Sequence, residues 1–288
     1  MNVRIAFIDH HLHNWHADTF LKQMRSGTAG SGGEVAAAWE IDSGDGDWCR
    51  DNEVPRASSI EEAVSMADAV MCLAPDNIED HARLCRQIAP FGKPMFVDKY
   101  LAPTLAEARE IVELAQQNGA PLLCSSALRY AAELTEALEL ADGPPDEMFV
   151  RGMGKWQGYG IHSVSPIVRG MGGGAMRLAD TGTPESRLIA LDYGGRRATI
   201  EVHDCENGYE LFSWQFGIRR GRQFRTGEVR KYDAFYANQL EAVVRFFQTH
   251  EPDMPVVDAL AVVAILEAAD QSQSKDGAWV KLATGADL

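Results

Sequence analysis

The sequence predicts an α/β protein of two domains: a doubly wound parallel sheet, then an α+β domain with a mostly antiparallel open sheet. Three observations lead to this fold class. Short apolar runs alternate with helical patterns through residues 1–125, which is typical of strand–helix–strand units. From about residue 145, runs of β-forming residues follow one another with turn residues between them. The 288 residues are enough for two domains of ordinary size, which we place at 1–125 and 126–288.

The first domain is expected to contain five strands with helices between them. Ser, Thr or Asp residues placed three positions before Glu mark the helix starts, and Gly119 ends the last helix. Such alternation implies parallel strands whose two faces are both covered by helices. The expected strands are 3–8, 34–41, 69–74, 94–98 and 121–125, and the expected helices are 14–24, a short one after 58–59, 76–91 and 104–118.

The second domain is expected to contain an open sheet that is followed by two helices at the end of the chain. The glycine run at 170–174 follows a helical stretch, so it indicates a helix C-cap and turn rather than a phosphate loop. The apolar faces of the closing helices also allow them to pack back on the first domain. The expected strands are 148–156, 187–193, 198–203, 210–214 and 223–229, and the closing helices are 235–249 and 258–274.

Composition excludes several classes of partner. The formal net charge of −15 repels nucleic-acid phosphates and anionic lipid headgroups. The longest apolar stretch, 259–266, is far shorter than a membrane span, and we find no signal peptide. The five cysteines are scattered without a CxxC pair, which fits reduced thiols. We therefore expect a cytoplasmic protein that binds neither nucleic acid nor membrane.

Several local strings resemble the Gfo/Idh/MocA family, the glucose-fructose oxidoreductase and inositol dehydrogenase group. APDNIEDH at 74–81 and GKPMFVDKYLAPTLAEA at 92–108 resemble the family's strand, Thr-Pro-Asn turn, helix and Glu-Lys-Pro loop, with Asp98-Lys99-Tyr100 in place of Glu-Lys-Pro. GYGIHSVSPIVRGMG at 158–172 resembles the Gly-x-His turn that opens a helix beside the substrate. The C-terminal EAADQSQSKDGAWVKL is also similar, so the resemblance spans nearly the whole chain. The chain therefore resembles a divergent member of the family.

The resemblance implies a Rossmann-like N-terminal domain that holds NAD(P) and a C-terminal domain whose open sheet covers the substrate and forms an oligomer interface. It implies an NAD(P)-dependent oxidoreductase that acts on a secondary alcohol of a sugar, sugar acid or cyclitol, in a homo-oligomer. Carboxylates at the end of the second strand could bind a ribose diol and disfavour a 2′-phosphate, which slightly favours NAD over NADP. The residues expected to contact the cofactor are Asp9, His10, His11, His13, Glu40, Asp42, Ala74, Pro75, Asn77, His81 and Asp98.

Two residues are candidates for the chemistry, because oxidising a secondary alcohol requires that the hydroxyl proton is removed while hydride leaves to the nicotinamide. Lys99 follows a strand at the carboxyl edge of the parallel sheet, where open α/β sheets bind ligands, and its ammonium can polarise the substrate oxygen. His162 matches the family's histidine and has an ordinary pKa, about 6.5, that suits a general base.

The residues around these two differ in part from the family pattern. The resemblance places an aspartate four residues before the histidine, but Gly158 is found there, and Tyr159 is the candidate to supply a hydroxyl instead. Arg129 and Tyr130 match positions that contact substrate, and an Arg fork suits a carboxylate or a vicinal diol. An equally good interpretation is that Arg129 ties a helix start to the domain interface.

The dinucleotide turn is the main departure from the family. A G-x-G-x-x-G turn lets pyrophosphate approach amides at a helix start, but residues 9–16 are DHHLHNWH and no glycine occurs before Ser26. This departure leaves open a lyase or isomerase that uses Lys99 and His162 without an exchanged cofactor, and also a non-catalytic binding subunit. The spacing of His11 and His13, or of His13 and His16, also allows a metal site with Asp9 as a third ligand, but we predict none and favour a role of these histidines in binding cofactor phosphate or substrate.

Overall fold

The computed structural model describes residues 2–139, 143–205 and 213–283. Residues 1–125 and 236–256 form one compact unit, and residues 126–235 and 257–288 form a second. In the described part of the chain, no helix is long and apolar enough to span a membrane.

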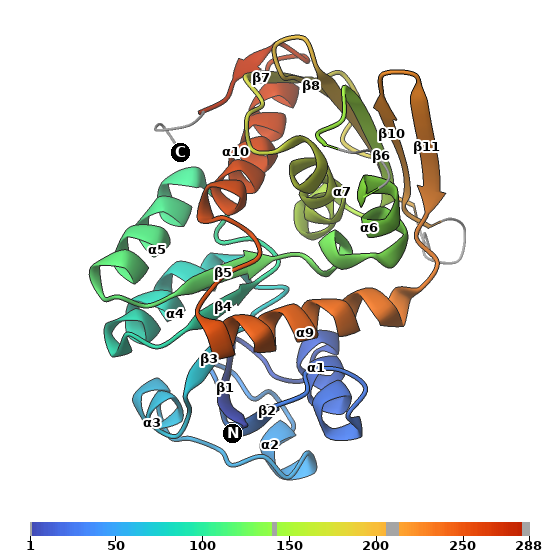
Figure 1. Ribbon diagram of the computed structural model, residues 1–288. Coiled ribbons are helices and arrows are strands. Elements are labelled where there is room, and N and C mark those ends of the chain that lie inside the picture. Colours follow the sequence, from blue (N-terminus) through green and yellow to red (C-terminus); the bar gives the residue numbers. More distant parts are fainter. Residues whose placement is uncertain (1, 140–142, 206–212, 284–288) are drawn as a thin grey trace. The chain divides into compact units, whose positions relative to one another are not determined.

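The first unit is built on a five-stranded sheet in the order β2-β1-β3-β4-β5, and every neighbouring pair of strands is parallel. Residues of β3, β4 and β5 are all buried, because helices flank the sheet (Figure 1). The predicted doubly wound parallel sheet is therefore confirmed. The strands are β1 (Val3–Asp9), β2 (Gly33–Glu40), β3 (Ala69–Cys72), β4 (Met95–Asp98) and β5 (Leu122–Ser125), and the helices are α1 (Trp15–Ser26), α2 (Trp48–Asp51), α3 (Ile60–Ser65), α4 (His81–Ile88) and α5 (Leu105–Gln117).

Two further helices follow the second sheet along the chain. Helix α9 (Tyr232–Thr249) begins in the second unit and continues in the first, where Gln239 Nε2 donates to the Ser125 carbonyl at 2.9 Å. Helix α10 (Val256–Gln273) lies almost wholly in the second unit. Its described residues are buried nearly all round, which explains why its apolar residues form a continuous run.

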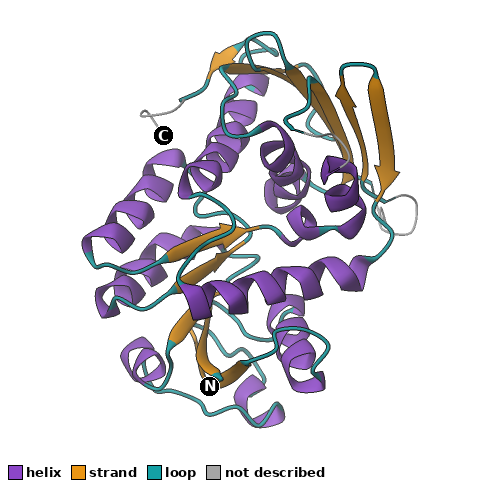
Figure 2. Ribbon diagram, viewed as in Figure 1, coloured by secondary structure: helices purple, strands orange, loops and turns teal. Residues whose placement is uncertain are grey.

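The second unit contains a seven-stranded sheet in the order β11-β10-β6-β9-β8-β7-β12. All neighbouring pairs are antiparallel except β6 and β9, so the mostly antiparallel sheet is confirmed. Helices α6 (Ala132–Glu139) and α7 (Trp156–Met171) pack on β6, β9, β10 and β11 (Figure 2). The strands are β6 (Glu147–Met153), β7 (Arg177–Asp180), β8 (Ser186–Asp192), β9 (Arg197–His203), β10 (Gln215–Arg220), β11 (Gln223–Glu228) and β12 (Val280–Lys281).

Three expectations for this sheet need correction. Of the predicted strand 210–214, residues 210–212 lie outside the described residues, and β10, which begins at Gln215, was not predicted. The predicted strand 148–156 ends at Met153, because helix α7 begins at Trp156. Strands β7 and β12 were not predicted, since four and two residues are too few to show a clear alternation.

The start of α7 is irregular, and this irregularity sets the position of the residues that follow. Gln157 and Gly158 have non-helical backbone angles, and Gly158 has a φ of 89° that only glycine adopts without strain. The Arg187 guanidinium lies 4.6 Å from the centre of the Trp156 ring and pairs with the buried Asp180. These contacts anchor the first turn of α7 to the sheet.

Candidate functional site

The turn between β1 and α1 is held closed by an asparagine. Asn14 is the N-cap of α1, and its Oδ1 accepts from the amides of His16 at 2.9 Å and Ala17 at 3.0 Å. Its Nδ2 donates to Asp9 Oδ2 at 2.9 Å and to the His11 carbonyl at 2.7 Å. The cap was predictable, since Asn before a helical pattern is a frequent helix start, but our sequence prediction did not use it.

Asp9 is a buried carboxyl at the end of β1, with 1% of its surface exposed. Its Oδ1 accepts from the amides of His11 at 3.2 Å and Ala74 at 3.1 Å. Burial raises the pKa of Asp9 to about 7, although the hydrogen bonds from Asn14 and the backbone oppose this shift. The carboxyl thus stands in the turn where a glycine-rich motif would carry no side chain.

Glu40, at the end of β2, is also engaged within the chain. Its Oε2 accepts from the Leu12 amide at 2.7 Å, and its Oε1 pairs with Arg56 Nη2 at 2.9 Å. Its side chain is 1% exposed. The predicted contact of Glu40 with a ribose diol stays a prediction, and it would require these bonds to be exchanged.

The histidines of the turn lie on its flanks. His10 Nδ1 contacts Asp80 Oδ2 at 2.6 Å, and His11 Nδ1 contacts the Asp42 carbonyl at 2.8 Å. The ring centres of His11 and His13 lie 5.5 Å apart, and the two ring planes are tilted by 35°. His11 therefore covers the loop after β2, where the side chain of Asp42 accepts from the Gly44 amide.

The alternative of a metal site finds no support in the geometry. His16 contacts the Asp98 carboxyl and packs edge-to-face against the Tyr236 ring. Among the residues that the structure describes, no three His, Cys, Asp or Glu side chains are grouped so that they could hold a metal ion.

The turn can be tested directly for its fit to a pyrophosphate. Such a group binds at a helix start by accepting hydrogen bonds from backbone amides. Here the amides of residues 11, 12, 16 and 17 already donate to side chains of the chain itself. Two of the three acceptors, Asp9 and Glu40, are carboxyl groups, and an ionised carboxylate repels phosphate. As they stand, these residues do not fit a pyrophosphate held in the manner of a glycine-rich turn.

The raised pKa of Asp9 has a consequence for stability. The folded state holds the Asp9 proton more tightly than the unfolded chain, so this group's contribution to stability is present at low pH and is lost as the pH rises toward about 7. We expect the free energy of unfolding to fall by about 2 kcal/mol more in the wild type than in Asp9→Asn between about pH 5.5 and about pH 8. Urea unfolding at the two pH values measures the difference, and equal pH dependence in the two proteins would disprove it.

The loops after β3 and β4 bring Lys99 into contact with Asp76. Lys99 has a φ of 61°, which is strained for a residue with a side chain, and its amide donates to Asp98 Oδ1 at 2.9 Å. Its Nζ lies 3.3 Å from Asp76 Oδ1, and its side chain is only 7% exposed, whereas that of Asp76 is 81% exposed. A nearly buried ammonium is thus fixed at the carboxyl edge of the parallel sheet.

The other residues predicted in these loops have structural contacts. His81 is fully buried, with Nε2 3.0 Å from the Leu73 carbonyl and Nδ1 3.0 Å from the Tyr100 carbonyl. Burial lowers the pKa of His81, and its ring lies between carbonyl groups of the two loops. Ala74 and Pro75 are buried, and the Asn77 side chain donates to Glu79.

In the second unit, His162 is held by a serine that the sequence did not indicate. Ser126 Oγ lies 2.8 Å from His162 Nδ1, and His162 is 8% exposed. Tyr159 and Trp214 place their rings edge-to-face with the imidazole, at 5.8 Å and 5.7 Å. No local pattern could have revealed Ser126, because it lies 36 residues before His162.

Arg129 and Tyr130 lie in the short helix that follows Ser126, at Ala127–Tyr130. Arg129 is 7% exposed, and its carbonyl accepts a short hydrogen bond from Arg169. Burial raises the pKa of Asp258, and the charge of Arg129 opposes this shift. The Arg129 carbonyl therefore has a partner within the second unit, whereas its Nη1 is buried without a hydrogen-bond partner among the described residues. Its contact with substrate stays a prediction.

Comparison with known proteins finds a family match for the first part of the chain. Residues 6–125 match the Gfo/Idh/MocA model, described as an oxidoreductase family with an NAD-binding Rossmann fold. No curated protein matches the chain significantly.

Many solved structures share the fold over almost the whole chain. GenD2 from gentamicin A biosynthesis, in complex with NAD, has a TM-score of 0.83 at 15% identity and covers 98% of this chain and 97% of its own. A probable dehydrogenase from Thermotoga maritima has a TM-score of 0.82 at 14% identity, with 97% and 99% covered. A myo-inositol dehydrogenase from Corynebacterium glutamicum ATCC 13032 has a TM-score of 0.80 at 11% identity, with 99% and 100% covered. At such identities, the likeness concerns the fold alone.

Proposed function

We propose, from the match of residues 6–125 to the Gfo/Idh/MocA family of oxidoreductases with an NAD-binding Rossmann fold, that this chain is an NAD(P)-dependent oxidoreductase acting on a secondary alcohol of a sugar, sugar acid or cyclitol. The observation that carries the proposal is Lys99, a nearly buried lysine held in a strained conformation at the carboxyl end of β4. Strain and buried charge at this edge of a parallel sheet are typical of a functional position.

Lys99 supplies the positive charge in this proposal. Its contact with Asp76 limits the positions that the ammonium can take, so the charge is oriented before substrate arrives. An oriented ammonium with little water around it stabilises the negative charge that develops on the alcohol or carbonyl oxygen.

His162 takes the hydroxyl proton in this proposal. Ser126, Tyr159 and Trp214 surround the imidazole, so its ring plane is fixed. Arg129, Tyr130 and the Tyr159 hydroxyl are assigned to positioning of the other substrate hydroxyls or a carboxylate.

The closed β1–α1 turn affects how tightly a dinucleotide cofactor can bind. A dinucleotide must displace Asn14 from the helix start before its phosphates can reach the amides there, so we expect weak binding. The same observation favours a second candidate, in which Lys99 and His162 remove a proton next to a carbonyl without an exchanged cofactor, as in a lyase or isomerase.

One titration separates the two candidates. After the isolated protein has been checked for retained nucleotide, NAD, NADH, NADP and NADPH are titrated into it by calorimetry. Saturable binding or retained nucleotide supports the oxidoreductase, and assays on a panel of sugars and cyclitols follow. No binding and no retained nucleotide favour the cofactor-independent enzyme.

The role of Lys99 is testable by substitution. We expect Lys99→Ala to lower turnover by a factor on the order of 10² while the protein stays folded, because the developing charge loses its partner. Lys22→Ala, on the exposed side of α1, is the control and should turn over like the wild type. Unchanged turnover in Lys99→Ala would remove Lys99 from the mechanism.

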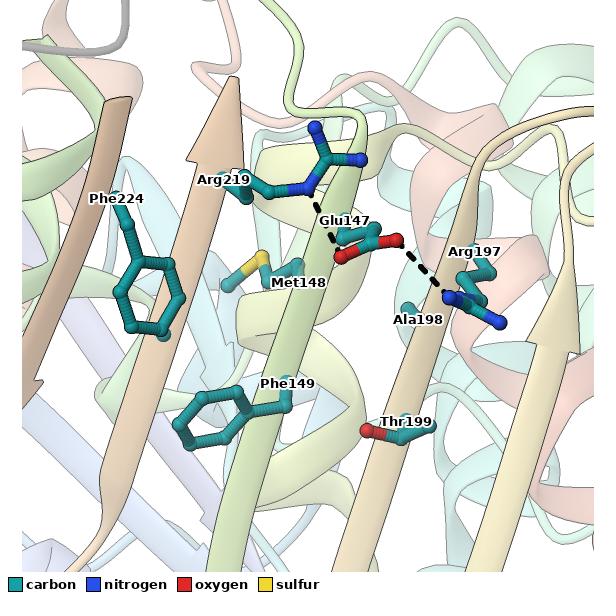
Figure 3. A pocket seen from close by; sticks show the side chains of 9 residues that line it. Glu147, Met148, Phe149, Arg197, Ala198, Thr199, Arg219 and Phe224 are labelled. Carbon is teal, nitrogen blue, oxygen red and sulfur yellow. Dashed lines mark hydrogen bonds and ion pairs between the residues drawn. The ribbon is translucent and has the colours of Figure 1, made fainter. Parts of the chain in front are cut away.

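We also propose that the chain forms a homo-oligomer through the open face of the second sheet. On this face, Glu147 Oε1 pairs with Arg197 at 3.1 Å and its Oε2 with Arg219 at 2.9 Å (Figure 3). Phe149 covers Gly217 on the neighbouring strand and is 36% exposed, and Phe224 is 55% exposed. Exposed aromatic rings beside neutralised charges are typical of a surface that pairs with a second copy.

The oligomer is tested by light scattering. The wild type is expected to have a mass larger than one chain, and Phe149→Glu with Phe224→Glu is expected to yield monomers, because two buried like charges oppose association. The exposed Trp15→Glu variant, in the other unit, should leave the mass unchanged. A monomeric wild type would refute the proposal.

A further inference from the structure

The group that contacts His162 Nδ1 comes from a distant part of the chain. Ser126 directly follows β5, is 1% exposed, and places its Oγ 2.8 Å from His162 Nδ1. The helix that carries His162 cannot easily supply such a group from its first turn. Gly158, one turn earlier, has a φ of 89°, and a residue with a side chain there would be strained by roughly 1–3 kcal/mol.

The rings around His162 restrict its rotation. Tyr159 meets the imidazole edge-to-face at 62° and Trp214 at 71°, so each fixes the tilt of the ring plane. Neither contact distinguishes the two ring nitrogens, because both act through the faces and edges of the rings. The hydroxyl of Ser126, in contrast, contacts Nδ1 in particular.

The chemistry of the imidazole then follows from its tautomer. A neutral histidine can accept a proton at Nε2 only when its own proton is on Nδ1. With the proton on Nδ1, the buried ring must find an acceptor there, and an unsatisfied N–H would cost about 1–3 kcal/mol. Ser126 Oγ is placed to be that acceptor.

We propose that Ser126 is a positioning residue for His162: its Oγ accepts a hydrogen bond from Nδ1–H and holds the tautomer whose Nε2 takes the substrate proton. This inference rests on the proposed function for the use of Nε2, but the tautomer itself does not depend on any activity. When Nε2 is protonated, the same bond strengthens, because its donor is then charged. Unlike a carboxylate, the serine hydroxyl adds no negative charge to the site.

Nitrogen NMR of histidine-labelled protein tests the tautomer, with His162 assigned from the missing signals of His162→Asn. In the wild type, we expect Nδ1 to carry the proton at a pH where the ring is neutral. In Ser126→Ala, we expect a mixture of tautomers with a larger share of Nε2–H. Ser126→Thr, which keeps the hydroxyl, is expected to restore the wild-type signals.

The matched control is Ser165→Ala. Ser165 is also a fully buried serine in the second unit, and its hydroxyl has no hydrogen-bond partner among the described residues. Its substitution should leave the His162 signals unchanged. Identical His162 signals in Ser126→Ala and the wild type, or a wild-type ring with its proton on Nε2, would overturn the inference.

Kinetics give a second readout once a substrate is found. We expect Ser126→Ala to lower kcat by a factor of about 10 to 10² with little change in KM, and Ser126→Thr to recover most of the loss. If the tautomer shifts as expected but no dehydrogenase activity exists, the proposed function fails and the role of Ser126 stands. If Ser126→Ala alters KM alone, the serine contacts substrate and the positioning role is wrong.

Discussion

Replacing His162 with asparagine is expected to lower kcat by a factor of 10² to 10⁴ and to leave KM nearly unchanged. The asparagine amide reaches the region of Nδ1, so it can keep the hydrogen bond with Ser126 while the proton-accepting Nε2 is removed. The loss therefore reports on proton transfer rather than on packing. Steady-state kinetics on the substrate found in the sugar and cyclitol panel, with circular dichroism to confirm folding, make the measurement.

The second unit offers a close control for this substitution. His203, on β9, has its Nδ1 2.9 Å from Ser186 Oγ, in the same kind of histidine–serine pair. Because His203 has no role in the proposed reaction, His203→Asn should retain the wild-type kcat. Equal activity of His162→Asn and the wild type would show that another group takes the proton.

Opening the β1–α1 turn is expected to raise the affinity for NADH by a factor of 10² to 10⁴. In Asp9→Gly with Asn14→Gly, the amides of His16 and Ala17 become available, and a hydrogen bond to a charged group is worth about 1.5–3 kcal/mol. The same change removes a carboxyl that repels phosphate whenever it is ionised. Calorimetry at about pH 8, where Asp9 is mostly ionised, gives the largest contrast.

Asn118→Gly is the control for this experiment. Asn118 caps the other end of a helix, α5, and its Nδ2 donates to the Leu114 carbonyl at 2.8 Å. Its replacement changes a cap without exposing amides to a phosphate, so NADH affinity should not change. If the wild type already binds NADH as tightly as the opened variant, the internal hydrogen bonds do not obstruct the dinucleotide.

Much of the fold could be predicted because its signals are local. The capping serine Ser59 and the capping threonine Thr104 accept from the amides of Glu62 and Glu107, as their spacing indicated. The open sheet was predicted less well. Its short edge strands have no clear alternation, and β10 was not predicted.

Residues of the candidate site could be predicted only where a single local stretch of sequence identifies them. Lys99 and His162 came from such strings, and the absence of glycine in the turn was visible at once. The partners of these residues were not, because Asp76 and Lys99 are 23 residues apart and Ser126 and His162 are 36 apart. Tertiary contacts over such separations leave no periodic pattern in the sequence.

Helix α9 has a consequence for the order in which the chain folds. The unit that begins at the N-terminus is completed by residues 236–256, where Leu240 is fully buried against Gly30 and Glu241 accepts from the Gly30 amide. During synthesis, the five parallel strands therefore leave the ribosome long before the helix that covers them. Contacts of such long sequence separation slow folding, and the nascent sheet exposes apolar surface in the meantime. A fragment that ends at residue 125 would keep that surface exposed and would be prone to aggregate.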